Sequence, residues 1–123
     1  HSPFDAINTN LVPWKTTENP YISSVMYADK QIGLFFEAAK KTAWYNNTIF
    51  VLVSDHSHTT PQNHVFASPA FYHIPLLITG GALREQFRGI KDNRIASQTD
   101  IATTILAQLE IDNKAYNWSK NSN

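Results

Sequence analysis

The chain contains at residues 48–56 the stretch TIFVLVSDH, an unbroken apolar run that ends abruptly in Ser54, Asp55 and His56. Six consecutive β-branched, aromatic or aliphatic residues bounded by polar ones predict a strand covered on both faces, as in a parallel sheet. A second run, IPLLIT at residues 74–79, stops at Gly80-Gly81 and carries a proline near its start, where a strand tolerates one. We therefore expect two strands, the first of them buried, joined by a loop of about twenty residues.

Helical periodicity flanks both strands. The first helix is predicted over residues 20–43, because Asn19 and Pro20 form a cap and first-turn pair and one face then repeats at helical spacing. That face comprises Ile22, Val25, Ile32, Phe35, Phe36 and Ala39. The second helix is predicted over residues 99–109, with Ser97 or Thr99 as its cap and Asp100 near its positive end.

Helix, strand, loop, strand and helix in this order predict an α/β fold with a mostly parallel sheet and flanking helices. The 123 residues are enough for one globular unit. We expect an irregular arm at 1–19, an α/β unit at 20–112 and a tail at 113–123. Ten basic and ten acidic residues cancel, so no nucleic-acid or anionic-membrane footprint is present.

Asp55 and His56 are the first candidates for chemistry, because ligands of α/β sheets bind beyond the carboxyl ends of strands. The chain has no cysteine, so any metal must be held by oxygen and imidazole nitrogen. An Asp-His pair suits Zn²⁺ or Mn²⁺ but supplies too few ligands for a whole site. The structural alternative is that Asp55 caps the loop and His56 bonds to backbone.

Histidines are concentrated in the loop between the two strands. Four of the five in the chain lie between residues 56 and 73: His56, His58, His64 and His73. Histidine suits metal ligation, anion contact and proton transfer near neutral pH. The alternative is that His58 and His64 are solvated loop residues, and for His73 we favour that interpretation.

Four blocks, in their order and spacing, resemble those of the sulfatase family within the alkaline phosphatase superfamily. They are YADKQIG at 27–33, TIFVLVSDH at 48–56, HIPLLI at 73–78 and SQTDIATTIL at 97–106. The opening His-Ser-Pro-Phe and the position of His64 resemble the lipoteichoic acid synthase-like branch and the related phosphoethanolamine transferases. The resemblance implies a partial alkaline phosphatase-like sandwich, truncated on its N-terminal side.

The resemblance also implies roles for individual residues. Asp55 and His56 would ligate one divalent metal ion, Mn²⁺ or Zn²⁺, with Ca²⁺ or Mg²⁺ as alternatives. His1 and His64 would contact the substrate, and His58 is a third candidate for that role. Many family members have glycine after the Asp-His pair, where this chain has Ser57.

The family nucleophile, a Thr or a modified Cys or Ser, lies upstream of the His-Ser-Pro-Phe block. We therefore expect this chain to be the C-terminal portion of a longer catalytic domain, with no catalytic nucleophile of its own and little activity alone. The parent would transfer a phosphate ester, in the manner of phosphoglycerol or phosphoethanolamine transferases. The alternatives are a true sulfuric ester hydrolase and, in another class, a non-catalytic binding or structural module.

The expected partners follow from the same resemblance. They are a phosphate- or sulfate-ester substrate on a lipid headgroup or glycan, and the missing N-terminal half of the domain. A membrane would be involved only through parent segments that this chain lacks. The parent would act outside the cytoplasm, in the bacterial envelope.

Overall fold

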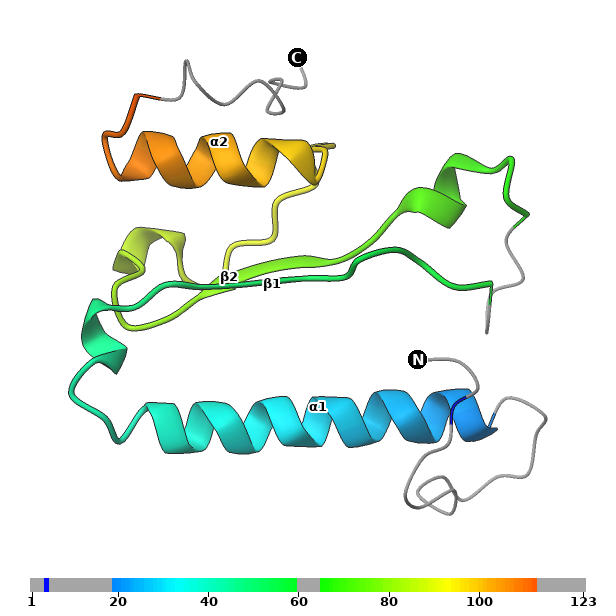
Figure 1. The fold of residues 1–123 in the computed structure, drawn as a ribbon, viewed down its shortest axis with the longest axis horizontal. Coiled ribbons are helices and arrows are strands. Elements are labelled where there is room, and N and C mark those ends of the chain that lie inside the picture. The colour runs from blue at the N-terminus through cyan, green and yellow to red at the C-terminus, as the bar shows by residue number, and fades with distance from the viewer. Residues whose placement is uncertain (1–3, 5–18, 60–64, 113–123) are drawn as a thin grey trace. The chain divides into compact units, whose positions relative to one another are not determined.

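Two α-helices, two β-strands and three short 3₁₀ turns make up the regular structure of the described residues (Figure 1). The computed structural model describes residue 4, residues 19–59 and residues 65–112. The chain forms two compact units, residues 1–88 and residues 89–123, which are treated separately. The first unit contains α1 (Asn19–Ala39), β1 (Phe50–Val53) and β2 (Leu76–Thr79), and the second contains α2 (Thr99–Gln108).

Helix α1 begins where the Asn19-Pro20 pair predicts but ends at Ala39, before the predicted residue 43. Both the backbone N–H and the hydroxyl of Thr42 bond to the Ala39 carbonyl, at 3.0 and 2.6 Å. These i to i−3 bonds tighten the last turn and close the helix. The 3₁₀ turn Tyr45–Asn47 then leads into β1.

Strands β1 and β2 pair directly with each other, and they are antiparallel. Phe50 lies opposite Thr79 and Val53 opposite Leu76. The predicted parallel arrangement is therefore wrong for this pair. An unbroken apolar run indicates burial but carries no information about direction. A parallel pair needs a crossover connection, usually an α-helix, and the described residues between the strands contain only the 3₁₀ turn Pro69–Tyr72.

Helix α1 and β1 pack together through aromatic rings gathered around Phe50. The Phe50 ring lies 5.7 Å from that of Phe35 and 4.9 Å from that of Phe36, both edge-on. The rings of Trp44 and Tyr45 complete the cluster at 6.1 and 6.0 Å. Edge-to-face contacts at these distances stabilise by about 0.5–1.5 kcal/mol each beyond the area they bury.

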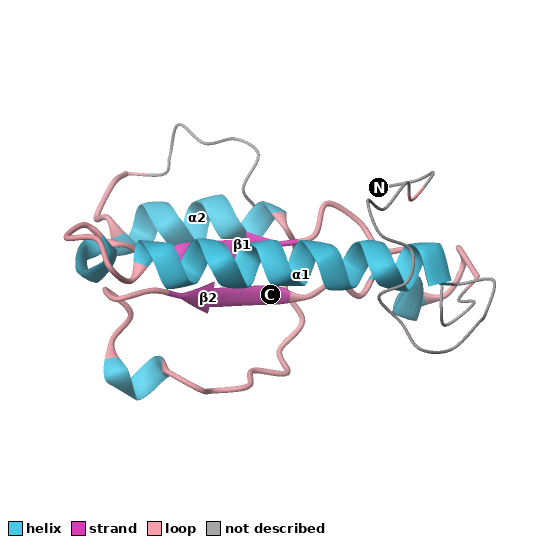
Figure 2. Cartoon of the chain, turned by 90° about the horizontal axis from the view of Figure 1, so that it is seen from below, coloured by secondary structure: helices cyan, strands magenta, loops and turns pink. Residues whose placement is uncertain are grey.

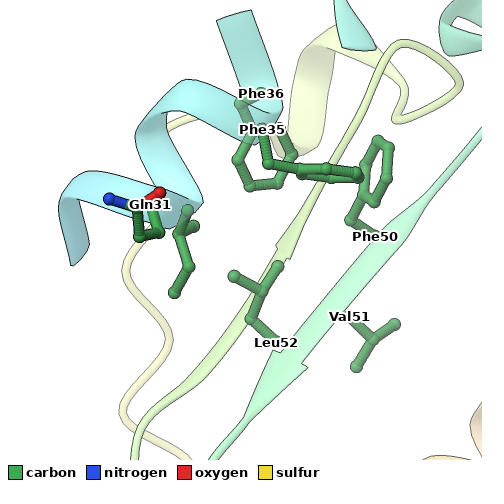
Figure 3. A pocket seen from close by; sticks show the side chains of 7 residues that line it. Gln31, Phe35, Phe36, Phe50, Val51 and Leu52 are labelled. Carbon is green, nitrogen blue, oxygen red and sulfur yellow. The ribbon is translucent and has the colours of Figure 1, made fainter. Parts of the chain in front are cut away.

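Beside this cluster lies an apolar pocket of about 350 Å³ between α1 and β1 (Figure 3). Phe50 and Leu52, two residues apart on β1, lie on the strand face turned towards the helix, as strand alternation requires. The pocket is lined by Gln31, Ile32, Phe35, Phe36, Phe50, Val51 and Leu52. It shows that α1 covers one face of β1 incompletely.

The prediction that the strand at residues 48–53 is covered on both faces is wrong for the described residues, and β2 is exposed as well. Leu76, Leu77 and Ile78 of β2 are all exposed, and Val53 at the end of β1 is exposed as well. Ala39 is the one buried apolar side chain in the described residues. The sequence therefore encodes more apolar surface than the described part of this unit buries.

Gly80 and Gly81 bring the end of β2 against the turn before β1. Gly80 has φ of 128°, and a Cβ there would lie 2.2 Å from the Thr48 carbonyl oxygen. A Cβ on Gly81 would lie 2.6 Å from the Tyr45 carbonyl oxygen. Only glycine fits where these two backbone segments come so close. A hydrogen bond of 3.3 Å from the Ala82 N–H to the Thr48 carbonyl also joins them.

In the second unit, α2 matches the predicted helix to within one residue and has hydrogen-bonded ends. The Asp100 carboxylate accepts a 2.8 Å bond from the Ser97 N–H, as in a capping box. At the other end the N–H groups of Glu110 and Ile111 donate to Ala107 and Leu106, in a Schellman arrangement with Glu110 at φ of 56°. Local sequence therefore specifies both ends of α2.

Before α2, Asp92 and Arg94 form a local ion pair on the surface. The Arg94 guanidinium donates to both Asp92 carboxylate oxygens at 2.6–3.1 Å, and the Arg94 N–H donates to one of them at 3.0 Å. These bonds from Arg94 lower the pKa of Asp92 to about 2.

Helices in the described residues are all too short or too polar to cross a membrane.

Gly80→Ala should lower the free energy of unfolding by about 2–4 kcal/mol, because it combines a strained φ with a backbone clash. Urea titration and hydrogen exchange of the Ala82 amide measure the loss. Gly33→Ala is the matched control: a Cβ there meets nothing within 4 Å, and the change should stabilise α1 by up to about 1 kcal/mol. Equal effects of the two substitutions would contradict this account.

The Asp92 carboxyl should titrate with a midpoint of about 2, measured by carbon NMR of the side chain. Because this pKa is lowered in the folded chain, the pair's stabilisation is present above the ordinary value of 3.8 and is lost as pH falls towards 2. Arg94→Gln should move the midpoint up towards 3.8, whereas Lys91→Gln should leave it in place. A midpoint that Arg94→Gln does not move would disprove the assignment.

Candidate functional site

The candidate site lies just after the end of β1, near the N-terminal end of α1. Strand β1 runs back along α1, so the segment after it reaches the helix's N-terminal end (Figures 1 and 2). Asp55 and His56 follow the last residue of β1, Val53, after the single residue Ser54. The strand therefore presents both side chains at its carboxyl end, as the sequence predicts.

Asp55 and His56 are both directed to solvent, with side chains 86% and 75% exposed. The Asp55 Oδ2 atom lies 3.5 Å from His56 Nε2. The other carboxylate oxygen, Oδ1, accepts a 2.9 Å bond from the His56 backbone N–H. One oxygen thus fixes the turn, while the second faces the imidazole.

The second imidazole nitrogen of His56 determines what Nε2 can do. Nδ1 lies 2.7 Å from the Ser57 carbonyl oxygen. A carbonyl oxygen only accepts hydrogen bonds, so a hydrogen bond here requires the proton on Nδ1, and in that tautomer the neutral ring presents a lone pair at Nε2. Metal-binding histidines are oriented in this way by a backbone carbonyl.

The bonds expected from the structural alternative, an Asp55 cap and a His56-to-backbone bond, are both present. They use Oδ1 and Nδ1, and they leave Oδ2 and Nε2 facing each other. Two ligands about 2.1 Å from a tetrahedral metal ion are separated by about 3.4 Å. The observed 3.5 Å and the oxygen-nitrogen donor set therefore fit one shared Zn²⁺ or Mn²⁺ ion.

His58 lies in a cluster of three aromatic rings. Its ring stacks on Tyr21 of α1 with centroids 5.1 Å apart and planes inclined by 18°. Phe4 meets His58 edge-on at 5.2 Å and Tyr21 edge-on at 5.3 Å. The cluster joins the loop after β1 to the first turns of α1 and to the last residue of the His-Ser-Pro-Phe block.

The structure brings together only some of the predicted site residues. Asp55, His56 and His58 share one short segment, whereas His73 is exposed at the end of the 3₁₀ turn η2 (Pro69–Tyr72). His1 and His64 lie outside the described residues, so their roles stay predictions. In the described part of the chain, no group of three or more His, Asp or Glu side chains could hold a metal ion.

Sequence inspection missed Tyr21 and Phe4 as neighbours of the site. Tyr21 follows the Asn19-Pro20 helix start, and Phe4 belongs to a block noted for its histidine. An aromatic residue in the first turn of a helix, at the end that the strand approaches, is the one signal that could have indicated the contact. Nothing in the spacing of Phe4 pointed to His58.

The Sulfatase family profile matches residues 8–111, which is most of the chain. The chain belongs to the Sulfatase family. The predicted resemblance is thus confirmed, and membership implies an alkaline phosphatase-like fold for the complete domain. Sulfatases are commonly metal-dependent enzymes, which agrees with the donor geometry of Asp55 and His56.

Two curated relatives are similar to this chain. A protein of Formosa agariphila named Sulfatase is 32% identical over 79 residues, covering 61% of this chain and 15% of the relative. Lipoteichoic acid synthase 2 of Bacillus subtilis is 29% identical over 110 residues, covering 78% of this chain and 16% of the relative. The chain therefore spans about one sixth of the length of these relatives, and no solved structure matches it.

The neutral His56 ring should carry its proton on Nδ1, because Nδ1 faces the Ser57 carbonyl. Long-range proton-nitrogen NMR spectra of the 15N-labelled chain report which ring nitrogen is protonated. His73, which is exposed to solvent, serves as the internal reference. A predominantly Nε2-protonated His56 would remove the lone pair from the side that faces Asp55 and would refute the ligand geometry.

Proposed function

We propose that this chain supplies Asp55 and His56 as two ligands of the catalytic metal in an enzyme that transfers or hydrolyses a phosphate or sulfate ester. The proposal is carried by the pairing of Asp55 Oδ2 with His56 Nε2 at the end of β1, in a chain that belongs to the Sulfatase family. The separation and donor types suit one divalent ion, and Mn²⁺ or Zn²⁺ is favoured over Ca²⁺ or Mg²⁺ because one donor is nitrogen.

Each part of this chain has a distinct task in the proposed reaction. A divalent ion in such a site offsets negative charge on the transferring group and activates an oxygen nucleophile. Asp55 and His56 would hold the ion, and the contact of Nδ1 with the Ser57 carbonyl would keep Nε2 available to it. His1 and His64 are proposed to contact the ester oxygens, and no residue of this chain is proposed as the nucleophile.

Transfer of a phosphate ester is the favoured reaction. The relative named lipoteichoic acid synthase 2 aligns with 78% of the chain, against 61% for the relative named Sulfatase. The second candidate is hydrolysis of a sulfuric ester, which the 32% identity to the latter supports. Assays of the parent protein with a phosphoglycerol lipid and with an aryl sulfate would distinguish the two reactions.

The setting of the parent enzyme is proposed from the same relatives. A lipid headgroup or a glycan carrying the ester is the proposed substrate, and the extracytoplasmic side of the bacterial envelope is the proposed location. Attachment to the membrane would come from segments of the parent other than the described helices, none of which could span a bilayer.

Asp55→Ala or His56→Ala in the full-length protein should reduce bound metal to below about one tenth of the wild-type content. Removing one ligand from an ion held by few side chains lowers affinity by several orders of magnitude. Elemental analysis after gel filtration measures the content. His73→Ala is the matched control and should retain metal, and normal metal content in both ligand variants would rule the proposal out.

A further inference from the structure

Residues 55–58, which follow β1 and Ser54, comprise two residues that face solvent and two that other segments of the chain contact. Asp55 and His56 are exposed, whereas Ser57 and His58 are half-buried. We propose that Ser57 and His58 are positioning residues that fix the Asp-His pair, and that His58 acts through its ring face instead of contacting substrate. The proposal rests on the metal-binding function proposed above.

Ser57 attaches the loop on one side. Its hydroxyl donates a hydrogen bond to the carbonyl of Phe71, in the 3₁₀ turn η2 that precedes β2. Phe71 is itself held by its neighbours, with ring centroids 4.7 Å from Phe66 and 5.3 Å from Tyr72. The glycine expected from the family pattern at position 57 has no hydroxyl, so this attachment is a property of this chain.

His58 attaches the loop on the other side. The three rings of Phe4, Tyr21 and His58 contact one another pairwise at 5.1–5.3 Å. Tyr21 lies in the first turn of α1, an element held independently by its contacts with Phe50. The loop is therefore fixed between a helix and a 3₁₀ turn, immediately after the two proposed ligands.

His58 could act as a positioning residue or as a ligand, and these two roles use different parts of the imidazole ring. Stacking on Tyr21 and the edge contact with Phe4 use the ring as a flat aromatic body, which phenylalanine can replace. Ligation of a metal or contact with an ester oxygen would require an imidazole nitrogen, which phenylalanine lacks. A His58→Phe substitution therefore preserves the first role and abolishes the second.

The experiment compares His58→Phe with His58→Ala in the 123-residue chain. Mn²⁺ alone is the probe, and paramagnetic broadening of the Asp55 and His56 amide signals gives its dissociation constant. We expect His58→Ala to weaken Mn²⁺ binding about 3- to 10-fold and His58→Phe to change it less than about 2-fold. Tyr21→Leu should reproduce the alanine result, and Tyr21→Phe should reproduce the wild type.

Control variants and a second measurement distinguish a positioning role of His58 from a role that needs its imidazole nitrogens. His73→Ala and His73→Phe make the same chemical changes outside the ring cluster and should alter neither readout. The heteronuclear NOE of the His56 amide, measured without metal, should fall in His58→Ala and in Ser57→Gly but not in His58→Phe. Equal weakening of Mn²⁺ binding by Phe and Ala would show that a nitrogen is required and would overturn the proposal, as would no change in either.

Failure of the underlying function gives a different pattern. If Mn²⁺ does not broaden the Asp55 and His56 signals of the wild-type chain, the metal pair is disproved for this chain. The positioning role is then decided by the heteronuclear NOE alone. A lower value in His58→Ala with a normal value in His58→Phe supports it, and an unchanged value in both overturns it.

Discussion

The contact of Phe50 with α1 fixes where the rest of the first unit can lie. Its ring meets Phe35 and Phe36 on the helix and Trp44 and Tyr45 in the intervening turn, so one side chain sets both the distance and the direction of β1. Because β1 then runs back along α1, its carboxyl end arrives at the first helical turn. The position of Asp55 and His56 is therefore a consequence of packing that occurs at the other end of the strand.

The candidate metal site combines exposure with rigidity. Ligands must face outward to reach an ion, yet a preorganised site needs side chains whose directions are fixed. Here the backbone supplies part of that order, through the Asp55 turn bond and the Ser57 carbonyl. Ser57 and His58 fix the rest of the loop through their contacts with η2 and α1. Asp55 and His56 can therefore be exposed while their directions are fixed.

Much of the secondary structure could be predicted from the sequence, because its signals are local. The Asn19-Pro20 start of α1 and the Ser97 and Asp100 bonds at the start of α2 involve neighbouring residues only. Strand direction could not be predicted, because the run at residues 48–53 is equally apolar in a parallel or an antiparallel pair. The position of Asp55 and His56 followed from the end of that run.

The ring cluster at His58 could not be predicted for a different reason. Phe4, Tyr21 and His58 come from three separate segments, and their contact depends on the path of β1 along α1. The hydroxyl of Ser57 was visible only as a departure from the family's glycine, and its bond to Phe71 required the fold of η2. The candidate ligands could thus be predicted from the sequence, whereas the contacts of Ser57 and His58 that position them depend on the tertiary structure.

The direct pairing of β1 with β2 has a consequence for the loop between them. The register is fixed by four residues on each strand, and the close approach of Gly80 to Thr48 adds a second constraint at the end of the ladder away from residues 54–75. A change in the length of the connection between His58 and η2 therefore leaves the strand register, and with it the position of Asp55 and His56, unaltered.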